Sequence, residues 1–84
     1  MTVPEPAVQI EQIEAMEREL ENARRAVART LRFKRETAGL SLRDVAPRLR
    51  LSAAALSNIE RGQSWRTRTI RRLALFYEKH LTAA

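Results

Sequence analysis

A long stretch without helix breakers constrains this chain more than any other feature. No glycine or proline stands between Ala7 and Ala38, and Gly39 follows directly. In this stretch apolar residues recur at gaps of three and four, and at 100° per residue all but the first fall within about 80° of one another. That narrow seam is typical of a coiled coil. Gly39 marks the end of the helix, because glycine readily adopts the left-handed conformation that ends helices. The pattern predicts one helix of about thirty residues with the seam Ile10, Ile13, Met16, Leu20, Ala23, Val27 and Leu31.

The length of this helix has a consequence for the overall shape. Thirty helical residues span about 45 Å, whereas a compact domain of this size has a radius of gyration near 12 Å. The N-terminal half must therefore project, and its seam needs a cover. We expect a second copy of the chain to supply it, while packing against the chain's own C-terminal helix and binding of a different protein remain open. The expected dimerisation residues are Ile10, Ile13, Met16, Leu20, Ala23 and Val27.

Charge is divided unevenly along the chain. The 84 residues carry 16 Lys and Arg against 10 Asp and Glu, a net charge of +6. Residues 1–28 have a net charge of −3 and residues 29–84 a net charge of +9. A polyanionic partner is therefore expected at the C-terminal two thirds. Within the acidic part, two pairs stand in the favourable i, i+4 order, Glu14 with Arg18 and Glu21 with Arg25.

Several classes of protein are excluded by the same composition. The chain has no cysteine, and His80 is its single histidine, so we expect no disulfide, no metal site and no cofactor. No apolar run approaches the roughly 18 to 20 residues that span a bilayer, and the acidic start is unlike a signal peptide. We expect no membrane association and a cytoplasmic protein at the nucleoid. No carboxylate pair, no nucleophile with a base and no phosphate-binding glycine loop points to an enzyme.

The middle of the chain predicts two short helices joined by a tight turn. Ser41 and Asp44 form a capping box, and Ser52 is a second N-cap. Gly62 closes the second helix. This arrangement is a helix-turn-helix, in which the second helix can lie in the major groove with its free N–H groups near phosphate. The inward residues are Leu42, Val45, Ala46, Leu49, Leu56 and Ile59. A last helix over about 68–81 turns Ile70, Leu73, Ala74, Tyr77 and Leu81 inward, with Phe76 at the edge.

From Leu31 to about Leu75 the chain resembles the Cro and phage-repressor type of helix-turn-helix family, often called XRE-like. The matching pattern is Arg-x-x-x-Gly-Leu-Ser at 35–41, Val45-Ala46, Leu49, Leu51-Ser52, Leu56-Ser57 and Ile59-Glu60-Arg61-Gly62. The resemblance implies an all-α, lambda-repressor-like helix-turn-helix domain at 31–82. Before this domain, Pro4, Pro6 and the apolar seam predict a disordered lead at 1–6 and a helical dimerisation segment at 7–30. It also implies a structural ion pair between Arg35 and Glu60.

Three residues depart from the family pattern. Arg50 stands in the turn where relatives usually have glycine, at a cost of about 1 kcal/mol if the backbone there is left-handed. Pro47 removes a helical hydrogen bond and should kink or shorten the first helix of the motif. Leu42 replaces a glutamine that often binds phosphate in the family, so that contact is missing.

The resemblance also implies a set of DNA-contacting residues. In the recognition helix, about 53–61, only Asn58 can make the bidentate contact to adenine, so specificity should depend on DNA shape, dimer spacing or a partner. The loop after Gly62 follows the sugar-phosphate backbone, and Trp65 either fills the core or lies against that backbone. The predicted DNA-binding residues are Arg32, Arg43, Ser52, Ala53, Ala54, Ser57, Asn58, Arg61, Gln63, Ser64, Trp65, Arg66 and Arg68.

Two classes of function follow from these residues. The first is a DNA-binding transcriptional regulator, a repressor or an activator, that binds double-stranded DNA as a homodimer. The second is a protein-interaction module, like an antitoxin or an adaptor, that holds another protein with its acidic N-terminal helix. RNA is a weaker third candidate, because the stacking aromatics of single-strand readers are nearly absent.

Overall fold

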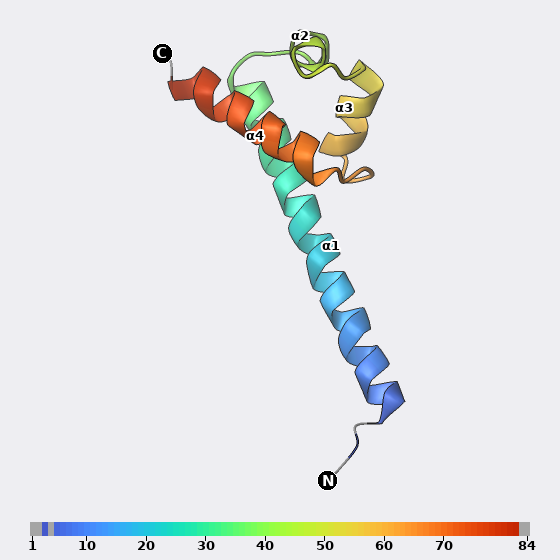
Figure 1. Cartoon of the computed structure of the whole chain (residues 1–84). Coiled ribbons are helices and arrows are strands. Elements are labelled where there is room, and N and C mark those ends of the chain that lie inside the picture. Colours follow the sequence, from blue (N-terminus) through green and yellow to red (C-terminus); the bar gives the residue numbers. More distant parts are fainter. Residues whose placement is uncertain (1–2, 4, 83–84) are drawn as a thin grey trace.

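The computed structural model describes residues 3 and 5–82, with side chains up to residue 80. The described part consists of helices and connecting turns and contains no strand, as predicted for an all-α fold. The elements are α1 (Pro6–Thr37), α2 (Leu42–Val45), the 3-10 helix η1 (Ala46–Leu49), α3 (Ala53–Glu60) and α4 (Thr67–Thr82) (Figure 1).

The first helix is a single rod of 32 residues. It ends at Thr37 with Ala38 as its C-cap, and Gly39 follows with φ +72°, as the sequence predicted. It begins one residue earlier than expected, because Pro6 needs no N–H donor in the first turn of a helix. Of the predicted disordered lead, residues 1–2 and 4 lie outside the described part, and Pro6 is helical.

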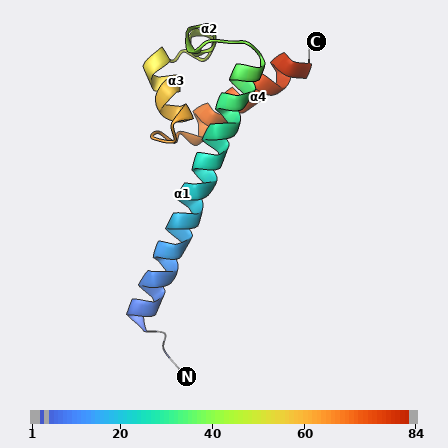
Figure 2. The same ribbon diagram turned by 180° about the vertical axis from the view of Figure 1, so that it is seen from behind.

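The N-terminal half of α1 projects beyond the rest of the molecule, as its length required. The chain measures 60 × 25 × 18 Å with a radius of gyration of 17.3 Å. Both side views show the other helices gathered at the C-terminal end of α1 (Figures 1 and 2). The alternative in which the seam covers the chain's own C-terminal helix does not hold for the N-terminal half of the seam, because Ile10, Ile13 and Met16 remain 54%, 52% and 67% exposed. Leu31, near the other end of the seam, packs with α4.

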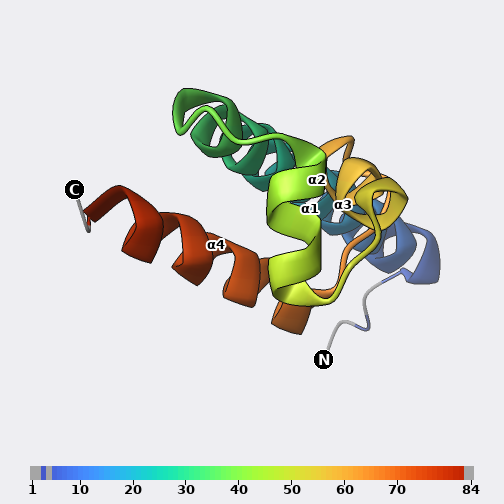
Figure 3. The ribbon, with the colours of Figure 1, turned by 90° about the horizontal axis from the view of Figure 1, so that it is seen from above.

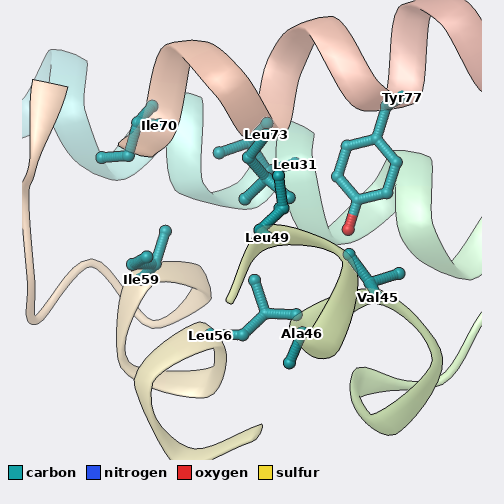
Figure 4. Packing of buried hydrophobic residues seen from close by; sticks show 9 residues of the cluster. All are labelled: Leu31, Val45, Ala46, Leu49, Leu56, Ile59, Ile70, Leu73 and Tyr77. Carbon is teal, nitrogen blue, oxygen red and sulfur yellow. The ribbon is translucent and has the colours of Figure 1, made fainter. Parts of the chain in front are cut away.

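The core lies where α2, η1, α3 and α4 surround the last turns of α1 (Figures 3 and 4). Leu31 joins α1 to this core, so the apolar seam changes function along the helix, from an exposed stripe to a packing surface. The cluster of buried residues is Leu31, Val45, Ala46, Leu49, Leu56, Ile59, Ile70, Leu73 and Tyr77.

The first helix of the motif is short, as the proline predicted. Ser41 and Asp44 form the predicted capping box, with Ser41 N donating to Asp44 Oδ2 at 2.7 Å and Asp44 N donating to Ser41 Oγ at 3.0 Å. These bonds lower the pKa of the Asp44 carboxyl. The α-helix then stops at Val45 and continues as a 3-10 helix that contains Pro47. Arg50 ends this segment in the left-handed conformation, with φ 57° and ψ 40°.

The predicted ion pair between Arg35 and Glu60 is confirmed and ties α1 to α3. Arg35 Nε donates to Glu60 Oε2 at 2.7 Å and Nη2 donates to Oε1 at 2.9 Å. Arg35 Nη1 also donates to the carbonyl of Leu40 at 2.9 Å. The two side chains are only 12% and 4% exposed. The hydrogen bond to Glu60 raises the pKa of the Arg35 guanidinium.

Some expectations about single side chains were wrong. Glu21 and Arg25 form their i, i+4 pair at 2.7 Å, but no ion pair joins Glu14 to Arg18 among the described residues. Both of these side chains are exposed, where such a pair contributes little. In α4, Ala74 is exposed and does not face inward as expected, whereas Phe76, expected at the edge, is half-buried and packs against the core. The side chain of Leu81 lies outside the described part.

Candidate nucleic-acid interface

The second helix of the motif, α3, presents a narrow outer face made of small side chains. Ser52 is exposed and caps the helix, accepting a hydrogen bond from Ala55 N at 3.0 Å. Ala54 is exposed, and Ala53 and Ser57 are half-buried. The backbone at this end can therefore approach a partner closely, with free N–H groups and the positive end of the helix dipole directed outward.

A shallow hollow lies beside this face, where α3 meets the loop that follows it. Three of the predicted site residues, Asn58, Ser64 and Arg66, line it together with Leu51, Ala55 and Ile59. Arg66 and Ser64 come from the loop, and Asn58 comes from the helix. The neutral side chains of Asn58 and Ser64, which can donate hydrogen bonds, thus lie beside the guanidinium group of Arg66.

Asn58 has a partner that the sequence reading missed. Its Oδ1 accepts a hydrogen bond from Arg61 Nη2 at 2.7 Å. A bidentate contact to adenine needs both the oxygen and the amide of this side chain, and the bond from Arg61 takes one of the two acceptor positions of that oxygen. The i, i+3 spacing of Asn58 in α3 and Arg61 at its C-cap was the available signal.

The arginines predicted to contact phosphate are exposed, but they differ in whether a carboxylate of the same chain already binds them. Arg43, Arg66 and Arg68 are exposed, and the carbonyl of Arg66 accepts from Ile70 N at 2.8 Å at the start of α4. Arg32 is exposed too, but its Nε donates to Glu36 Oε1 at 2.7 Å. The Arg32 guanidinium thereby lowers the pKa of the Glu36 carboxyl.

Trp65 and Gln63 lie apart from the hollow, on the side of the loop that faces α1. The guanidinium carbon of Arg24 stands 5.3 Å from the centroid of the Trp65 ring, and Trp65 Nε1 donates to Thr67 Oγ1 at 2.9 Å. The ring is half-buried and packs against the core. Gln63 is exposed and lines a second groove with Trp65 and residues of α1. The structure therefore separates these two residues from Asn58, Ser64 and Arg66.

The role of Arg24 was not foreseen from the sequence. Arg24 stands seven residues, about two helical turns, before Leu31, so the helical repeat places it on the same side of α1 as that buried residue. A cation above a tryptophan ring contributes about 0.5–1 kcal/mol at an exposed site. This contact fixes the loop against α1.

The capped helix pair, its tight turn and the exposed second helix define a helix-turn-helix protein. The chain belongs to this family: residues 26–78, well over half of its length, match the family described as helix-turn-helix domain. The match begins in α1 and ends in α4, so it contains the whole core. Comparison with curated proteins and with solved structures gave no match.

Membership of this family indicates DNA binding. Domains of this type are typically binding modules rather than enzymes. No helix in the described part of the chain is both long enough and apolar enough to cross a membrane.

Proposed function

We propose that this chain is a DNA-binding transcriptional regulator of the Cro and phage-repressor type. The observation that carries the proposal is the exposed, serine-capped N-terminal end of α3 beside the hollow that contains Asn58, Ser64 and Arg66. An α-helix fits the major groove of B-DNA. Small side chains at Ala53 and Ala54 would let α3 enter that groove deeply.

Arginines around α3 support binding to the phosphate backbone. Arg66 and Arg68 are exposed directly after the loop, and Arg43 is exposed on α2. Phosphate contacts of this kind fix the position of a protein on the duplex, while base contacts give sequence preference. Asn58 is the proposed base-reading residue, and Arg61 beside it would bind a phosphate. Ser52, Ser57 and Ser64 would add neutral hydrogen bonds.

The exposed seam of α1 supports homodimerisation. Ile10, Ile13, Met16 and Leu20 are half or more exposed in the single chain, and no other described element covers them. Two copies joined by this seam would bring two recognition helices to one duplex, which raises affinity without further contacts.

The decisive experiment removes the two arginines after the loop. We expect the Arg66→Ala/Arg68→Ala variant to bind duplex DNA much more weakly and to lose about 1.8 from the slope of log K against log salt concentration, since each phosphate contact contributes about 0.9. Fluorescence anisotropy with random and selected duplexes at several salt concentrations measures this, and circular dichroism checks the fold.

A charge-matched variant separates a specific surface from general attraction. Arg18→Ala/Arg29→Ala removes the same charge from exposed positions on α1 and should change binding little. If duplex binding survives the loss of Arg66 and Arg68, or falls equally in the control variant, the assignment of the phosphate-binding residues is wrong.

The alternative is a protein-interaction module that uses the acidic half of α1. Glu11, Glu14, Glu17 and Glu19 are exposed without an ion pair, which supports an interaction with a basic partner protein. A chain that fails to bind any duplex at low salt, while folded and monomeric, would favour this function over the first.

A further inference from the structure

The exposed seam of α1 runs directly into a corner of the molecule. Leu20, Glu17, Glu21 and Arg24 form one side of a groove there, and the loop residues Gly62, Gln63 and Trp65 form the other. Further along the same face, Ala28 and Leu31 are buried by the domain. The domain therefore stands on the same side of α1 as the seam and begins where the seam ends.

We propose that two copies of this chain pair through their α1 helices in antiparallel orientation, with the N-terminal turn of each helix seated in the corner of the other. This inference rests on the homodimer in the proposed function and gives it a geometry. The occupant of the groove is thus the start of α1 from the partner chain.

The position of the domain argues against a parallel pair. Helices that pack through an apolar seam lie 8–10 Å apart, and the two seams face each other across the symmetry axis. In a parallel pair both domains would stand on that axis at the same level, from Leu20 onward, and would occupy the same space. In an antiparallel pair each domain stands beyond the N-terminus of the other helix, where space is free.

The distribution of charge along α1 argues in the same direction. Residues 5–21 hold six glutamates and one arginine, whereas residues 22–37 hold six bases and one glutamate. A parallel pair would set the two Arg24 side chains at the same level, and likewise the two Glu5 side chains, which is unfavourable. An antiparallel pair brings Glu5 of one chain toward Arg24 of the other. Arg24 is held over Trp65 at the corner and has no carboxylate partner in the single chain.

The corner also sets the register. The first helical residue, Pro6, can reach the level of Arg24 in the partner before it meets the loop. Ile10 then lies opposite Leu20 of the partner, and Ile13 lies near Met16 of the partner. This register puts Ile10, Ile13, Met16 and Leu20, each half or more exposed in the single chain, against one another.

This geometry places the two domains far apart. At 1.5 Å per residue, Leu31 of one chain stands about 50 Å from Leu31 of the other along the helix axis. That separation exceeds the 34–36 Å between half-sites one turn apart. The dimer therefore suits half-sites spaced by more than one turn, or two separate duplexes.

Cysteine cross-linking tests the orientation, because the chain has no cysteine of its own. We expect a mixture of the Ile10→Cys and Leu20→Cys variants to form a mixed disulfide at least five times faster than either variant forms one alone. In the antiparallel register, like positions lie about 15 Å apart along the axis, beyond the reach of a disulfide. Rapid self-linking of Ile10→Cys would indicate a parallel pair and overturn the proposal.

Sedimentation of the full chain without DNA tests whether the pair exists at all. We expect a dimer at 100 µM, a monomer for Leu20→Asp and a dimer for the control Asn22→Asp, which places the same charge on the opposite side of α1. A monomeric parent chain, or equal behaviour of the two variants, would overturn the proposal. Because these measurements use no DNA, their failure is distinct from loss of DNA binding in the Arg66→Ala/Arg68→Ala variant.

Discussion

Removal of the Glu60 carboxylate should destabilise the domain more than any surface change of the same size. The side chain is 4% exposed and accepts two hydrogen bonds from Arg35, which is itself 12% exposed. Breaking a buried pair by removing one partner costs about 3–5 kcal/mol, because the other charge stays buried without its counter-ion. Part of this cost is offset in Glu60→Ala by the bond from Arg35 to the Leu40 carbonyl, so we expect a value near the lower limit, about 3 kcal/mol.

Against the total stability this loss is large. The free energy of unfolding of a domain of this size is about 4–13 kcal/mol. Each kcal/mol lost lowers Tm by about 4–8 °C. Glu60→Ala should therefore lower Tm by at least about 12 °C. Urea and thermal unfolding followed by circular dichroism and by Trp65 fluorescence measure the change. The variant Glu36→Ala breaks an exposed pair with Arg32 and serves as the matched control, with a Tm close to that of the parent.

A double variant separates the charge effect from packing. Arg35→Met/Glu60→Leu removes both charges and fills their space with apolar atoms, and such replacements are often neutral or stabilising. We expect it to be more stable than Glu60→Ala. A loss below about 1 kcal/mol for Glu60→Ala, or a double variant less stable than the single one, would refute the view that an uncompensated buried charge causes the loss.

Three further changes test individual features. Arg50→Gly should stabilise the fold by up to about 1 kcal/mol, since the left-handed backbone costs a non-glycine residue about 1–2 kcal/mol and glycine returns part of that as entropy; if Arg50→Ala stabilises equally in urea unfolding, strain is not the cause. Ser52→Ala should cost about 1 kcal/mol through loss of the α3 cap, and an unchanged unfolding midpoint would show that the cap contributes nothing. Burial raises the pKa of Tyr77 to about 12, so the neutral phenol supports folding fully below about pH 10, and this support is lost as the pH rises toward 12. Tyr77 is the single tyrosine of the chain, so the absorbance of tyrosinate reports the ionisation of Tyr77 alone. Titration of Tyr77 near pH 10 in the folded protein would contradict the raised pKa. The Tyr77 hydroxyl is buried without a partner, and Tyr77→Phe should therefore be at least as stable as the parent.

The features predicted correctly from the sequence are mostly those that depend on residues close to one another along the chain. Ser41 with Asp44 and the glycine after the first helix needed only local rules for helix ends. The projection of α1 followed from its length alone. The pair between Arg35 and Glu60 is different, because 25 residues separate them; it was accessible only through resemblance to a known family.

The features that the sequence did not reveal depend on how side chains meet in space. The contact of Arg24 with Trp65 joins two segments whose relative position is set by the packing of the core. The division of the loop into one side that faces α1 and one side that faces the hollow beside Asn58 has the same origin. The exposure of Ala74 depends on the rotation of α4 about its axis, which an approximate inward face cannot specify within one residue.

The absence of any break in α1 makes this helix one rigid shaft that carries the exposed seam and also holds α3 through the bond from Arg35 to Glu60. Adding a single residue between the seam and the domain would lengthen the shaft by about 1.5 Å and turn the domain by about 100°. Adding seven residues would nearly restore the original angle while moving the domain outward by about 10 Å. The number of residues in this helix therefore sets both the distance and the relative rotation between the exposed seam and the domain.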